Sequence, residues 1–168
     1  MTALRFNLAD AIRAQDEWGA NCGPGALAAI MGLTLDEVRP LILGFEDRRY
    51  TNPTMMQGAL RRLGAKWSNP APVIWPIHGL VRIQWEGPWT KPGVPARVAY
   101  RHTHWVAART VVKPRFSIGV FDINAMNSGG WIPLKEWGEV LVPWLLQECE
   151  PKATGRWWLT HVYEIERK

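Results

Sequence analysis

The sequence predicts an α+β fold in which N-terminal helices pack on a C-terminal antiparallel β-sheet. Two observations lead to this class. Residues before about position 64 are rich in helix formers and carry helix-start and helix-stop signals, whereas from residue 65 onward prolines and glycines separate short runs of β-forming residues. Helices followed by an antiparallel sheet is the order of an α+β domain. At 168 residues, we expect a single domain over residues 1–168.

Three early helices are predicted from their termination signals. Residues 25–31 are small and apolar, follow a proline that the first turn of a helix tolerates, and end at Gly32. Thr34 and Glu37 form a capping box that predicts a helix over 35–43. A third helix begins with Thr54 as its cap and ends at Gly64.

The rest of the chain predicts strands and one late helix. Five strands are predicted from β-branched and aromatic runs, at residues 80–85, 96–100, 104–112, 116–123 and 157–165. The turn around Lys113 and Pro114 joins two of them, and the turn-rich segment 86–95 is interpreted as a loop within one sheet. A late helix is predicted over 134–146, with Pro143 breaking or kinking it.

Charge and hydropathy exclude several classes of partner. The formal charge is +5, but lysines and arginines are scattered without a basic stripe that alternates with aromatic residues, so we expect no nucleic acid partner. No apolar run approaches the roughly 20 residues that span a bilayer, and the N-terminus lacks the apolar region of a signal peptide. We therefore expect no membrane span and a cytoplasmic protein, or a virion-associated one if the chain is phage-encoded. The sequence carries no signal for an oligomeric state.

Cys22 is the first candidate for chemistry. With Cys149 it is one of two cysteines, too few for a disulfide framework and without zinc-type ligand spacing, so we expect no metal and no cofactor. Cys22 lies in Gly19-Ala-Asn-Cys-Gly-Pro-Gly-Ala-Leu27, at a junction from loop to helix. The unpaired N–H groups of a helix N-terminus favour a thiolate. The alternative is a small buried apolar residue, which is the commoner role of a lone cysteine.

His104 is the candidate base. It begins a predicted apolar strand, so its ring would project from the end of the sheet, where it could meet a helix N-terminus and form a thiolate–imidazolium pair. His102, two residues earlier and on the same face, is the alternative; we prefer His104 because the apolar strand begins directly after it. We expect His78 and His161 to be structural.

Two further residues complete the candidate set. Asp122 ends the strand that follows His104, and hairpin geometry brings the start of one strand beside the end of the next, so Asp122 is predicted to orient His104. Asn124 is the alternative orienting residue. Gln15, seven positions before Cys22, is a candidate side-chain amide that could stabilise an oxyanion together with the Cys22 backbone N–H, or else a solvated helix residue.

Taken together, these residues resemble the papain-like cysteine peptidases. The chain looks closest to compact bacterial and phage members related to the bacteriocin-processing peptidase domains. The matching segments are Cys22-Gly-Pro-Gly-Ala-Leu27, His104-Trp-Val106, Phe121-Asp122 and, more loosely, Gly129-Gly-Trp-Ile-Pro-Leu134. In that family the glutamine precedes the cysteine by six positions, whereas Gln15 precedes Cys22 by seven.

The resemblance implies a papain-like fold with the active site between the helices and the sheet. It further implies that Cys22 is the nucleophile, His104 the general base and then acid, Asp122 its orienting partner and Gln15 an oxyanion donor. The expected activity is a thiol-dependent hydrolase that cleaves a peptide or isopeptide bond of a peptide or protein substrate through an acyl-enzyme on Cys22. The alternatives are an acyltransferase that uses the same residues and a non-catalytic papain-like structural or binding module, for example a phage component.

Overall fold

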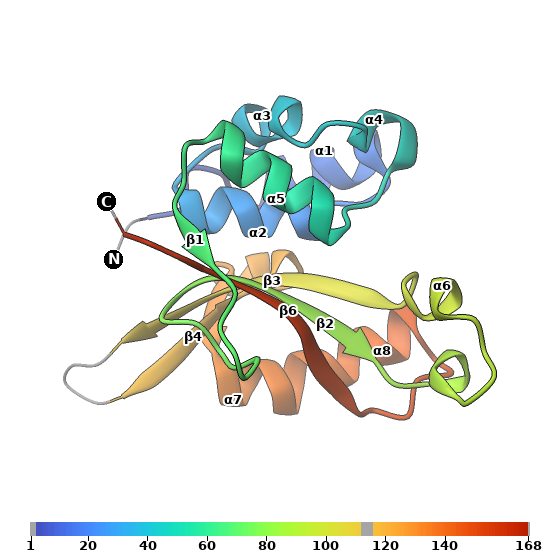
Figure 1. The fold of residues 1–168 in the computed structure, drawn as a ribbon. Coiled ribbons are helices and arrows are strands. Elements are labelled where there is room, and N and C mark those ends of the chain that lie inside the picture. The colour runs from blue at the N-terminus through green and yellow to red at the C-terminus, as the bar shows by residue number, and fades with distance from the viewer. Residues whose placement is uncertain (1–2, 112–115, 168) are drawn as a thin grey trace.

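The computed structural model describes residues 3–111 and 116–167 and has three layers. Figure 1 shows a sheet with one group of helices, drawn in blue and green, over one face, and the orange helices α7 and α8 against the other. The α+β class and the antiparallel sheet that the sequence predicts are confirmed, and the late helix forms a second helical layer against the other face of the sheet. None of the helices in the described ranges is long and apolar enough to cross a membrane.

The first helical layer contains five short helices and a 3₁₀ turn. They are α1 (Leu8–Trp18), α2 (Cys22–Met31), α3 (Leu35–Val38), η1 (Arg39–Leu41), α4 (Phe45–Arg48) and α5 (Pro53–Arg62). The capping box of Thr34 and Glu37 is confirmed, but the helix predicted over 35–43 changes to the 3₁₀ turn η1 after Val38, because Pro40 cannot donate the next helical hydrogen bond. The cap of α5 is Asn52, whose side chain accepts from Met55 N at 2.9 Å, so the prediction of Thr54 was wrong by two residues.

The sheet has six strands in the order β1-β6-β2-β3-β4-β5, and every neighbouring pair is antiparallel. The strands are β1 (Trp67–Ser68), β2 (His78–Trp85), β3 (Thr103–Val111), β4 (Ser117–Phe121), β5 (Trp131–Pro133) and β6 (Trp157–Ile165). The prediction of 157–165 is confirmed, β1 and β5 were not predicted, and β4 is shorter than predicted because the chain turns into the 3₁₀ segment η3 (Ile123–Ser128). Val112, Lys113 and Pro114, which we assigned to a strand end and a turn, lie outside the described residues.

The strand predicted over 96–100 was wrong. Residues Ala96–Ala99 form the short helix α6, which is closed by a hydrogen bond from Tyr100 N to Ala96 O at 3.2 Å, and the 3₁₀ turn η2 (Pro88–Thr90) precedes it in the loop. A strand needs a neighbour for its ladder, and both edges of β2 are already occupied by β3 and β6. The apolar residues of this segment therefore satisfy their backbone groups locally.

The late helix is continuous but not uniform. It consists of α7 (Leu134–Glu136), the π-helical turn η4 (Trp137–Leu141) and α8 (Val142–Cys149). Pro143 stands in the first turn of α8, where a missing N–H is tolerated, and the irregularity predicted near it takes the form of the π-turn just before. This turn has a consequence for the site, because it begins at the buried Trp137.

Two apolar clusters hold the layers together, one on each face of the sheet. The first lies between the sheet and the early helices and includes Leu27, Met56, Leu60, Leu80, Trp105 and Tyr163. The second lies between the sheet and the late helix and includes Val81, Ile83, Trp85, Val106, Trp137 and Leu145. Alternate residues of β2 and β3 enter opposite clusters, as the two-residue period of a strand requires.

Candidate active site

Cys22 is the first residue of α2 and is half-buried. Two glycines let this first helical turn approach its neighbours. A Cβ on Gly23 would lie 2.1 Å from Thr51 Oγ1, and one on Gly25 would lie 2.8 Å from Ile123 Cδ1. The glycines of the Cys-Gly-Pro-Gly motif therefore allow close packing of the helix start against the loop that contains Thr51 and against η3.

The sheet offers Cys22 an open strand edge. β4 pairs with β3 only as far as the Ala107–Phe121 pair, so β4 does not cover His104 and Trp105. The N-terminus of α2 packs there, and the backbone N–H of Trp105 is one of the groups that lower the pKa of the Cys22 thiol. The early end of β4 is thus what allows a helix start to reach the edge of β3.

His104 lies between Cys22 and Asp122. Its Nε2 is 2.8 Å from Asp122 Oδ2, and the interaction of its ring with the Cys22 thiol helps to raise the pKa of His104. Because Nε2 is taken by the carboxylate, Nδ1 is the ring nitrogen that remains for the sulfur. His104 is only 7% exposed, and its ring stacks on Trp85 with centroids 5.9 Å apart and an interplanar angle of 23°. Stacking on Trp85 and the hydrogen bond to Asp122 therefore both fix the orientation of the His104 ring.

Asp122 is fully buried and accepts four hydrogen bonds. Besides His104, Trp137 Nε1 donates to Oδ2 at 2.8 Å, and Asn124 donates to Oδ1 from its backbone N at 3.0 Å and from Nδ2 at 2.9 Å. An ionised carboxylate is an acceptor only, and these donors meet that requirement on both oxygens. Asn124, our alternative orienting residue, holds Asp122 instead.

The three groups shift one another's ionisation toward the charged forms. Burial raises the pKa of Cys22, but the hydrogen bond and charge of His104 and the Trp105 N–H outweigh it and lower this pKa below its ordinary value. Burial lowers the pKa of His104, yet the Asp122 carboxylate and then Cys22 raise it well above its ordinary value. Burial raises the pKa of Asp122, and His104, Trp137 and Asn124 reverse this to a net decrease. The arrangement favours a thiolate, an imidazolium and a carboxylate in a row.

The remaining histidines have other surroundings. His102, the alternative base, hydrogen-bonds through Nδ1 to both Glu150 oxygens at 2.9 and 2.8 Å and stacks on Trp89 with ring centroids 3.6 Å apart. These contacts hold the start of β3 to the end of α8. His78 and His161 have pKa values lowered mainly by burial, which favours their neutral forms.

Among the described residues, no hydrogen bond brings the Gln15 side chain to the thiol. It lies on the exposed side of α1, where its backbone oxygen accepts from Gly19 N at 2.9 Å. Within residues 3–111 and 116–167, no hydrogen bond links its side chain to Cys22 or His104. In the same part of the chain, no three His, Cys, Asp or Glu side chains are gathered as for a metal ion.

Sequence reasoning missed Trp137, which contacts the predicted Asp122 directly. It lies 15 residues after Asp122, as the first residue of the π-turn η4, and no local sequence pattern indicates a contact over that separation. No family model, curated protein or solved structure matches the chain. A thiol whose pKa is lowered, beside a buried imidazole whose pKa is raised, is equipped for nucleophilic attack on a carbonyl carbon.

Proposed function

We propose that the chain is a papain-like thiol hydrolase that cleaves a peptide or isopeptide bond through an acyl-enzyme on Cys22. The observation that carries the proposal is the continuous line of contacts from Cys22 through His104 to Asp122. These residues come from a helix start, a strand and a strand end, and only folding unites them. The order of a helix that carries the cysteine followed by a sheet that carries the histidine and the acid supports the papain-like part of the proposal.

Acylation begins with attack of the Cys22 sulfur on the substrate carbonyl carbon. The S–C bond forms, and the carbonyl electron pair moves to the oxygen, which the Cys22 backbone N–H at the start of α2 is suited to stabilise. His104 then gives its Nδ1 proton to the leaving amine as the C–N bond breaks. The amine product leaves, and the acyl group remains on sulfur as a thioester.

Deacylation uses the same residues in the opposite sense. Neutral His104 takes a proton from water, the resulting hydroxide attacks the thioester carbon, and the S–C bond breaks to release the acid and regenerate the thiolate. Asp122 keeps Nε2 in place and stabilises the imidazolium whenever it forms. An amine in place of water would give acyl transfer, so product analysis decides between the two.

Gln15 is proposed as a second oxyanion donor, as the resemblance implies. Removal of one such donor lowers kcat by about 10²–10³-fold in acyl transfer enzymes. We therefore expect Gln15→Ala to reduce turnover of a peptide substrate by about that factor while the alkylation rate of Cys22 is unchanged. If turnover is also unchanged, Gln15 is a solvated helix residue and the second donor lies elsewhere.

The nucleophile is tested by the pH dependence of alkylation. The protein contains its own reference, because Cys149 is a free, exposed cysteine. We expect iodoacetamide to label Cys22 with a midpoint pH below that of Cys149, since His104 lowers the pKa of the Cys22 thiol. Peptide mass mapping of one time course gives both rates in the same tube, and the midpoints are compared because burial slows Cys22 at every pH.

His104→Ala and His102→Ala form a matched pair of variants. We expect His104→Ala to lower the Cys22 rate at pH 6 by at least about tenfold, because burial then raises the thiol pKa and only the Trp105 N–H remains to oppose it. His102→Ala removes a histidine two residues away whose ring is held by Glu150 and Trp89, and it should leave the midpoint unchanged. Equal midpoints for Cys22 and Cys149, with no effect of His104→Ala, would refute the enzyme proposal and favour a binding module.

A further inference from the structure

Arg82 is a buried cation that has no carboxylate partner in the part of the chain that the structure describes. It is 4% exposed, its Nη2 donates to Thr103 Oγ1 at 3.2 Å, and its Nε has no hydrogen-bond partner among the described residues. In the same ranges no Asp or Glu oxygen lies within the 4.0 Å of an ion pair with the guanidinium. Burial of an unpaired charge is costly, so proteins rarely keep one that has no role.

The strand register places Arg82 beside the thiol. Arg82 is directly opposite Trp105 on the neighbouring strand β3, whose N-terminal part packs against α2, and the backbone N–H of Trp105 helps to lower the pKa of the Cys22 thiol. Paired strands are only about 4.8 Å apart. Leu80, two residues before Arg82, belongs to the apolar cluster under the early helices, so Arg82 projects toward the same layer as α2. The charges of Cys22 and the guanidinium act on each other.

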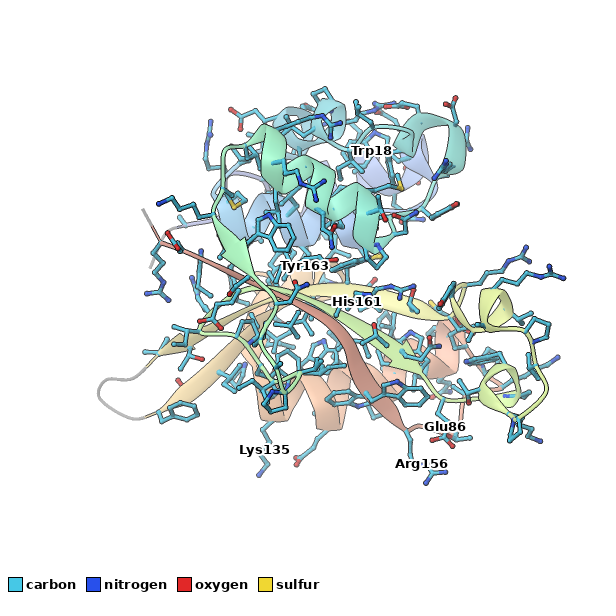
Figure 2. All side chains as sticks on the ribbon, in the orientation of Figure 1. Trp18, Glu86, Lys135, Arg156, His161 and Tyr163 are labelled. Carbon is cyan, nitrogen blue, oxygen red and sulfur yellow. The ribbon has the colours of Figure 1, made fainter. Side chains whose placement is uncertain are left out.

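Two more side chains surround the guanidinium. His161 is opposite Arg82 on the other neighbouring strand, β6, and its buried Nδ1 has no partner among the described residues. Figure 2 labels His161 and Tyr163, which are two residues apart on β6 and thus share the face toward the helices. The ring of Tyr100 lies 5.5 Å from the guanidinium carbon and is 61% exposed, so it separates Arg82 from solvent.

From this placement we propose that Arg82, together with His161 and Tyr100, forms a carboxylate-binding subsite beside the Cys22 thiol. The substrate of the proposed hydrolase would then carry a carboxylate near the bond that is attacked, either an acidic side chain or a free C-terminus. A carboxylate would supply the hydrogen-bond acceptor that Nε lacks. It would also supply the negative charge that balances the positive guanidinium. This inference rests on the proposed function and names the substrate class for it.

Two alkylating reagents test the subsite without a known substrate. Iodoacetate and iodoacetamide both transfer a methylene carbon to sulfur with loss of iodide, but only iodoacetate carries a carboxylate. We expect the ratio of iodoacetate to iodoacetamide rates to be at least about tenfold higher at Cys22 than at the exposed Cys149. Arg82→Gln should remove most of this preference, although His104 remains. Arg82→Lys, which keeps the charge but not the planar fork, should retain part of it.

Arg109→Gln is the matched control. Arg109 is also a sheet arginine that lies over an aromatic ring, 3.9 Å from the centroid of Trp131, but it is paired with His78 and Gly119, far along β3 from Trp105. Its substitution should leave the ratio unchanged. Because loss of a buried arginine can impair folding, wild-type protein gives a second measurement: propionate should slow alkylation of Cys22 by iodoacetamide in a saturable manner, and propionamide should not.

The outcomes separate the two proposals. The subsite is refuted, and the hydrolase proposal stands, if Cys22 keeps its low midpoint pH while three other results are negative. These are an iodoacetate-to-iodoacetamide rate ratio equal to that of Cys149, no change of this ratio in folded Arg82→Gln, and no protection of Cys22 by propionate. If the midpoint itself is ordinary, the hydrolase proposal fails first. Two pairs of peptide substrates then identify the source of the carboxylate. One pair differs only by Glu or Gln, and the other only by a free or an amidated C-terminus. The pair that carries the recognised carboxylate should show a higher cleavage rate for its charged member in the wild type, and this difference should be lost in Arg82→Gln.

Discussion

Trp137→Phe tests whether the buried hydrogen bond to Asp122 supports the candidate site. The change keeps an aromatic ring at a fully buried position but removes the indole N–H that lies 2.8 Å from Asp122 Oδ2. Asp122 then keeps three of its four hydrogen bonds, those from His104 and from the two nitrogens of Asn124. Since the carboxylate is completely buried, water cannot readily replace the lost donor.

The expected loss of stability follows from two contributions. A hydrogen bond to a charged group is worth about 1.5–3 kcal/mol, and the smaller ring loses roughly 1 kcal/mol of apolar burial. We therefore expect the free energy of unfolding to fall by about 2.5–4 kcal/mol at neutral pH. The control is Trp144→Phe on the adjacent α8, where the side chain is 52% exposed and the change should stay within about 0.5 kcal/mol.

The pH dependence separates the hydrogen bond from the change in packing. The pKa of Asp122 is lowered in the folded protein, so ionised Asp122 contributes stability above its unfolded pKa, and this contribution is lost as pH falls through the folded value. The charge-dependent part of the Trp137→Phe loss should thus be constant near neutral pH and shrink below about pH 4, the ordinary range of an aspartate. Urea unfolding followed by circular dichroism measures this, and a loss equal to that of Trp144→Phe, or one independent of pH, would refute the reasoning.

Two further substitutions probe how the fold positions the site. Gly23→Ala places a Cβ 2.1 Å from Thr51 Oγ1. We therefore expect a loss of about 1–3 kcal/mol in the free energy of unfolding and slower alkylation of Cys22. The control is Gly138→Ala, where a Cβ has room, and it should change stability by no more than about 0.5 kcal/mol. The buried amide of Gln84 donates to three backbone carbonyls, those of Trp85, Ala99 and His102. Gln84→Leu should therefore lower the free energy of unfolding, measured with heat or urea, by about 1–3 kcal/mol. A variant as stable as the wild type would contradict this role.

The parts of the fold that sequence reasoning predicted are those set by local chemistry. The capping box at Thr34 and Glu37, the stop at Gly32 and the strand Trp157–Ile165 each depend on residues a few positions apart. The expected proximity of His104 and Asp122 also came from local geometry, since a single turn was predicted between their strands, and His104 Nε2 lies 2.8 Å from Asp122 Oδ2. The prediction of a strand over 96–100 was wrong because the conformation of this segment depends on which strand edges are already paired, and that is a property of the whole sheet.

The sequence by itself determined a thiol at a helix start, an imidazole at a strand start and a carboxylate at the next strand end. Only the tertiary structure decided that the early end of β4 opens an edge for α2, that Trp137 reaches Asp122, and that Arg82 is buried near Cys22 with no hydrogen-bond partner for its Nε among the described residues. The physical reason is that hydrogen-bond partners and desolvation are set by residues distant in the chain. A residue's type states what chemistry it can perform, whereas its pKa and its neighbours follow from what the fold buries around it.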